Sequence, residues 1–183
     1  SPSDLDGHLL RGRVHLAKRE TNEALQDFQK VLKAEPRLAP VRYQLALAHL
    51  QAGSPQQAKT ELKEAVTIAP NFADAVLLLA DLNIRSGAVQ PAIEDLERLL
   101  ARQPKAHAAL VLLGSAYLAK REPARATEVY RRLVTLAPKD PRAVYLVGVG
   151  LLAQGKRAEG RKEFEAALAL APGFVDPLTQ LVG

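Results

Sequence analysis

Cysteine, methionine and tryptophan are absent from the 183-residue sequence, and only four tyrosines and four phenylalanines are present. Without cysteine the chain has no disulfide, no thiolate zinc site and no cysteine nucleophile. This absence is compatible with cytosol and periplasm alike, so the compartment stays open. No apolar run approaches the ~18 residues that a membrane-spanning helix needs. The net charge of +5 is too small to indicate a nucleic-acid partner by itself.

What the chain does contain is typical of a protein with a buried core, since 48% of its residues are hydrophobic and 25% are charged.

The main feature of the sequence is a repeat. Prolines recur every 34 residues, at Pro36, Pro70, Pro104, Pro138 and Pro172. If each proline is given position 32 of a unit, the repeats are 5–38, 39–72, 73–106, 107–140 and 141–174. Position 8 is then always small, as Gly12, Ala46, Ala80, Gly114 and Gly148.

Position 20 is also small in every unit, and position 24 is always an aromatic residue or leucine. Each unit contains two segments whose apolar residues recur at helical spacing, such as 43–50 and 58–66. Gly53, Gly87 and Gly155 lie between two such segments and suit the left-handed turn that ends a helix. One helical hairpin cannot bury both of its apolar faces, so the neighbouring unit must cover it. The sequence therefore predicts an all-α fold, an α-solenoid of stacked antiparallel helix pairs.

The exposed faces of the second helices carry charged residues four apart. The pairs Glu94/Arg98 and Glu128/Arg132 have the order that favours an ion pair on one helix face. We expect both pairs to form.

The period, the small residues at positions 8 and 20, Tyr117 at position 11 and proline at position 32 resemble the tetratricopeptide repeat (TPR). The resemblance covers residues 5–174. It implies a right-handed superhelix and a non-catalytic scaffold that binds a protein segment in its concave groove. The chain departs from the family at position 4, often tryptophan, where it has His8, Arg42, Val76, Leu110 and Val144.

In the TPR family, positions 5, 9 and 13 of the first helices point into the groove. The resemblance therefore implies a peptide-binding face formed by Arg13, Tyr43, Leu47, Leu77, Asp81, Arg85, Val111, Ser115 and Tyr145. Family members that bind chaperone tails clamp a carboxylate with Lys and Asn at positions 5 and 9, but Leu9 and Arg13 stand there in the first repeat. The largely apolar face suits a partner helix or an extended apolar peptide. The alternative is that part of this lining packs helix against helix.

Motifs for catalysis and cofactor binding are missing from the sequence. It has no Gly-x-Ser-x-Gly, no Gly-rich phosphate loop and no His-Glu-x-x-His, so we expect no enzyme activity, no cofactor and no metal. Two histidines, His15 and His49, share position 11 of neighbouring units, and His8 lies seven residues before His15. A shared metal is the alternative to packing between helices, but no carboxylate or thiolate column accompanies them at ligand spacing.

Basic clusters at 11–19, 131–132 and 156–162 leave nucleic-acid or polysaccharide binding as the alternative function. Acidic residues interleave with them, which favours a solubilising surface.

A composition rich in Ala, Leu and Arg favours a bacterial source, and the strings 114–120 and 164–168 resemble repeat proteins of bacterial envelope export and polysaccharide systems. Because the chain starts without Met and 175–183 resembles a truncated sixth repeat, we expect a longer array whose uncapped ends can self-associate.

Overall fold

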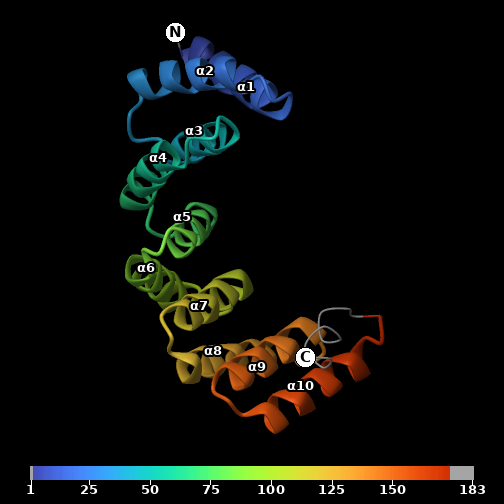
Figure 1. Ribbon diagram of the computed structural model, residues 1–183. Coiled ribbons are helices and arrows are strands. Elements are labelled where there is room, and N and C mark those ends of the chain that lie inside the picture. Colours follow the sequence, from blue (N-terminus) through green and yellow to red (C-terminus); the bar gives the residue numbers. More distant parts are fainter. Residues whose placement is uncertain (1, 174–183) are drawn as a thin grey trace. The chain divides into compact units, whose positions relative to one another are not determined.

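The computed structural model describes residues 2–173, and within this range the chain forms ten helices and no strand (Figure 1). They are α1 (Pro2–Ala17), α2 (Thr21–Ala34), α3 (Ala39–Gln51), α4 (Pro55–Ile68), α5 (Ala73–Arg85), α6 (Val89–Arg102), α7 (His107–Ala119), α8 (Pro123–Leu136), α9 (Pro141–Ala153) and α10 (Arg157–Leu170). The predicted all-α solenoid of helix pairs is confirmed. The segment 175–183, expected to begin a sixth repeat, lies outside the described residues.

The chain divides into two compact units, Ser1–Leu82 and Asn83–Gly183, with the boundary inside α5. In the first unit α1 packs on α2, α2 on α3, and α3 on α4. In the second unit each helix from α6 to α10 packs on the next in the same way. The second helices begin at residues 21, 55, 89, 123 and 157, so they follow the same 34-residue step as the prolines.

The turn between the two helices of a pair uses a left-handed backbone. Gly53, Gly87 and Gly155 have φ angles of 70°, 81° and 78°, as their position between helical segments predicts. In the first and fourth pairs Arg19 and Arg121 take the same conformation, with φ of 62° and 64°. A side chain in this region costs about 1 kcal/mol or more, so the identical turn is less favourable in these two pairs.

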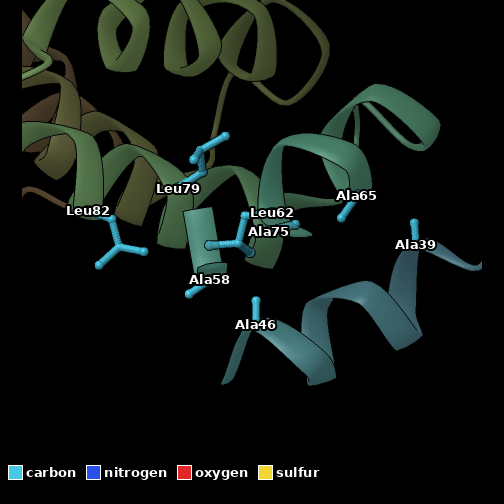
Figure 2. Close-up of a cluster of buried hydrophobic side chains, with 8 residues drawn as sticks. All are labelled: Ala39, Ala46, Ala58, Leu62, Ala65, Ala75, Leu79 and Leu82. Carbon is cyan, nitrogen blue, oxygen red and sulfur yellow. The ribbon is translucent and has the colours of Figure 1, made fainter. Parts of the chain in front are cut away.

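Figure 2 shows the core of the first unit, where eight buried side chains from α3, α4 and α5 gather. They are Ala39, Ala46, Ala58, Leu62, Ala65, Ala75, Leu79 and Leu82. Five of the eight are alanine, which lets the helix backbones approach closely, and leucines fill the remaining space. This is the packing that the small residues at positions 8 and 20 predict.

The residues at positions 8 and 24 of a repeat are complementary in size, so that the smallest residue at position 8 faces the largest at position 24. The rings of Phe28, Tyr130 and Phe164 lie against glycines at position 8, namely Gly12, Gly114 and Gly148. A Cβ atom added to these glycines would lie 2.6, 2.2 and 2.5 Å from the nearest ring carbon. Where position 8 is alanine instead, as at Ala46, position 24 is a leucine, Leu62. Each glycine therefore makes room for an aromatic ring from the second helix.

Two of the unusual residues at position 4, His8 and Arg42, contact an acidic side chain across the hairpin. His8 Nδ1 lies 2.5 Å from Asp27 Oδ1, and Arg42 Nη1 donates to Glu61 Oε2 at 2.7 Å. Asp27 and Glu61 both occupy position 23 of their units. In the first two pairs a polar contact between positions 4 and 23 thus links the two helices.

Candidate functional site

A pocket of about 440 Å³ lies beside α7 and α9 in the second unit. Its wall contains two residues of the predicted peptide-binding face, Val111 and Tyr145. The remaining lining residues are His107, Ala108, Leu133, Asp140, Arg142 and Leu146. The site therefore has a mostly apolar wall with three polar side chains.

Helical spacing explains why these side chains meet. His107 and Val111 are four residues apart on α7, and Arg142 and Leu146 are four apart on α9, so each pair shares one helix face. Buried Leu133 of α8 adds an apolar surface. The sequence thus brings the same repeat positions of neighbouring first helices to one place.

Two contacts fix the α9 side of the pocket. The Tyr145 ring packs on Phe164 with the ring centroids 5.4 Å apart and tilted by 37°. Asp140 is the N-cap of α9, and its carboxylate accepts a hydrogen bond from the Arg142 backbone N–H at 2.9 Å. An N-cap bond of this kind is worth about 1 kcal/mol. It holds the Asp140 carboxylate at the start of the helix.

The His107 and Arg142 side chains of the wall are exposed. Neither the His107 imidazole nor the Arg142 guanidinium has a hydrogen-bond or ion-pair partner among residues 2–173. Such groups are available to a ligand without breaking an existing interaction.

In the first unit the predicted face is partly used for packing. The Tyr43 ring makes an edge contact with Phe72, at 5.3 Å between centroids, and packs against the core cluster of Figure 2. Burial, and to a smaller extent the charge of Asp74, raises the pKa of Tyr43. Leu47 packs against a second buried cluster. Leu77 and Asp81 are half-buried.

The remaining members of the predicted face differ in exposure. Arg13 in the first unit and Arg85 in the second are exposed. Ser115 is half-buried, and its hydroxyl donates to the Val111 carbonyl at 3.0 Å and lies 3.3 Å from the Tyr130 hydroxyl. The Ser115 hydroxyl is thus bonded within the α7–α8 pair. Of the nine residues, the structure brings Val111 and Tyr145 together in one pocket.

Sequence reasoning missed a polar cluster at Tyr117, on the wall of a second pocket of about 320 Å³. The Tyr117 hydroxyl donates to Glu97 Oε1 at 2.5 Å, and the Arg125 guanidinium carbon lies 4.2 Å from the ring centroid. Burial, then the hydrogen bond to Glu97, raises the pKa of Tyr117 to about 12. The sequence feature that could have indicated this cluster is Tyr117 itself, the single aromatic residue at position 11 of the repeats.

Two of the four histidines, His8 and His15, contact acidic side chains. His8 contacts Asp27, and His15 Nδ1 lies 2.6 Å from Glu20 Oε2. Within the described residues no group of three His, Asp or Glu side chains could hold a metal ion.

Between residues 2 and 173, no helix has the length and apolar character needed to cross a membrane.

The comparisons with known proteins point to one architecture. The family described as the tetratricopeptide repeat protein 21 C-terminal ARM domain matches residues 4–144. No curated protein matches the sequence. A crystal structure of MamA is 26% identical over 93% of this chain and 93% of that chain, with a TM-score of 0.84.

Two further solved structures share the fold at lower identity. MamA from Desulfovibrio magneticus RS-1 is 19% identical over 93% of this chain and 97% of its own, with a TM-score of 0.82. YrrB, described as a TPR protein with an unusual peptide-binding site, is 16% identical over 94% of this chain and 89% of its own, with a TM-score of 0.79.

Proposed function

The chain belongs to the family of the tetratricopeptide repeat protein 21 C-terminal ARM domain, a TPR-like protein-interaction scaffold, and we propose that its first helices bind a segment of a partner protein. The observation that carries the proposal is the α7–α9 pocket, which joins Val111 and Tyr145 in one largely apolar wall. Its volume of about 440 Å³ falls in the range of sites that enclose a ligand group, ~300–1,000 Å³. A large apolar side chain of the partner fits this description.

The energetics favour such an anchor. Tyrosine is enriched among the residues that contribute most to binding, and these residues sit in desolvated pockets near the centre of an interface. The Tyr145 ring is held by Phe164, so little freedom of the ring is lost when a partner binds. The half-buried Leu77 of the first unit is a second candidate contact, on its own unit.

The sequence also led to expectations about catalysis, cellular setting and nucleic-acid binding. Scaffolds of this kind are typically non-catalytic, and we propose no reaction for this chain. The setting in bacterial envelope export or polysaccharide systems rests on sequence strings alone. Nucleic-acid binding through the basic faces is disfavoured by ion pairs such as Arg161 to Glu165, at 3.1 Å, which lower the positive potential there.

The test is a selection of short random peptides on the 183-residue chain, followed by titration of the selected peptides by fluorescence anisotropy. Val111→Glu places a charge in the apolar wall and should weaken binding by at least about 2 kcal/mol, or ~30-fold, the size of a hot-spot loss. Val14→Glu is the matched control, because Val14 is 44% exposed on α1. It should leave affinity unchanged.

A second variant guards against a folding defect. Ala108 is exposed and lines the pocket, so Ala108→Phe fills the space without replacing a buried side chain. Binding should fall in both pocket variants while their melting temperatures stay near that of the wild type. Selected peptides that bind both variants as well as the wild type would refute the proposal.

A further inference from the structure

We infer that the segment held by the α7–α9 pocket carries an acidic side chain next to a large apolar side chain. This inference rests on the proposed function, because it specifies the chemistry of the partner at the same pocket. The apolar side chain enters the pocket and contacts the wall formed by Val111, Leu133, Tyr145 and Leu146. The neighbouring carboxylate pairs with the Arg142 guanidinium and accepts a hydrogen bond from the His107 imidazole.

The charge around the pocket supports an acidic partner. The loops that precede α7 and α9 carry Lys105 and Lys139, both exposed, and the pocket wall adds the Arg142 guanidinium. The one acid in these loops is Asp140, whose carboxylate is bonded to the α9 backbone. The surface that surrounds the apolar wall is therefore positive, and complementary charge selects partners and speeds their association.

Arg142 is the strongest contact in this scheme. Its guanidinium is exposed, unpaired within residues 2–173, and only three positions before Tyr145. Arginine forms two parallel hydrogen bonds with one carboxylate, which makes the contact specific in geometry. A carboxylate beside the bound apolar side chain can be reached by this fork.

The source of the carboxylate is a side chain rather than a chain terminus. Capture of a terminal carboxylate uses converging backbone donors or, in TPR clamps, a set of Lys and Asn side chains. The wall of this pocket has no Asn, Gln or Lys. One arginine and one histidine suit a contact at the edge of the bound segment.

The experiment uses the 183-residue chain and random peptides displayed as internal insertions, so that the peptides have no free terminus. Selected sequences should be enriched in Asp or Glu within two residues of a large apolar residue. Replacing that acid by its amide should weaken binding about fivefold or more, and Arg142→Glu should weaken it about tenfold, because an attraction becomes a repulsion. Raising the salt from about 0.1 to 1 M shortens the screening length from ~10 to ~3 Å and should reduce the preference for the acid.

Arg131→Glu is the matched control, since Arg131 is exposed on α8 and does not line the pocket. The same change of charge there should alter affinity less than twofold. Arg142→Glu places a negative charge in the first turn of α9, where such a charge is favourable, so the variant should fold. A peptide in which lysine replaces the acid should bind Arg142→Glu better than it binds the wild type.

The outcomes separate this inference from the proposed function. Peptides that lose affinity for Val111→Glu but show no acidic enrichment, and respond equally to Arg142→Glu and Arg131→Glu, overturn the inference alone. If short peptides with a free carboxyl terminus bind but no internal insertion is selected, the choice of a side-chain carboxylate is overturned. Peptides insensitive to Val111→Glu overturn the proposed function, and the inference fails with it.

Discussion

The matching of Gly114 with Tyr130 gives the sharpest test of the packing. A methyl group at Gly114 would place Cβ 2.2 Å from Tyr130 Cε1 and 2.4 Å from Cζ, far inside van der Waals contact. Tyr130 is fully buried, and burial raises the pKa of its phenol. The ring has no solvent-exposed space into which it can move.

Two effects of Gly114→Ala oppose each other. Alanine in a helix interior is more favourable than glycine by about 1 kcal/mol, whereas overpacking of a core costs ~1–3 kcal/mol. Because two ring carbons would be within 2.5 Å, we expect the upper part of that range and a net loss of about 1–2 kcal/mol. In a chain of this size such a loss lowers the melting temperature by ~2–8 °C.

The rescue is Tyr130→Leu. Alone, this change leaves a cavity and should cost about 2 kcal/mol, but together with Gly114→Ala it recreates the Ala46/Leu62 pair of the second repeat. The double variant should therefore be more stable than the sum of the single changes by at least about 1 kcal/mol, a coupling typical of residues in contact. Urea unfolding followed by circular dichroism gives all four free energies.

Gly7→Ala is the control for helix propensity. The nearest atom to a Cβ at Gly7 is the end of the flexible Arg11 side chain, at 3.6 Å, so this change should stabilise the chain by up to about 1 kcal/mol. If Gly114→Ala is as stabilising as Gly7→Ala, or if the Gly114 and Tyr130 effects simply add, the packing argument is wrong.

Ala92 at position 20 is fully buried, so Ala92→Leu should cost ~1–3 kcal/mol in urea unfolding; a neutral result would contradict the close approach. Spectrophotometric titration should show Tyr117 ionising near pH 12, and Glu97→Gln should lower its pKa. Because the native pKa of Tyr117 exceeds the usual 10.0, its contribution to stability is complete below pH 10 and is lost as the pH rises towards 12. A Tyr117 pKa unchanged by Glu97→Gln would argue against the hydrogen bond.

Some side-chain partners differ from those that spacing suggests. The sequence predicts a Glu94/Arg98 pair, but Arg98 donates to Asp95 and Glu94 accepts from Gln90 at 3.0 Å. Residues three and four apart on a helix are about equally near. The choice between them depends on side-chain rotamers, which sequence spacing does not specify.

The sequence by itself determined the helices, their pairing and the small-residue contacts. The backbone hydrogen bonds of a helix join residues four apart, so helix formation depends on local sequence. The 34-residue repeat contains the same local pattern five times. Glycines such as Gly53 and Gly155, together with the recurrent prolines, therefore suffice to predict where the helices end. The small residues at position 8 are visible in the columns, whereas the structure shows that their partner is the side chain at position 24, since a Cβ on Gly114 would lie 2.2 Å from Tyr130. These features depend on backbone geometry and residue size.

Only the tertiary structure decided which predicted residues meet and what they bond. Val111 and Tyr145 line one pocket because α7 and α9 present the same repeat positions beside buried Leu133. The Ser115 hydroxyl is bonded within its own helix pair, and Glu97 accepts from Tyr117, which is 20 residues away in sequence. Contacts of this kind depend on the distance and rotation between helices. A shift of 1 Å breaks a hydrogen bond but leaves the apolar periodicity of the sequence unchanged.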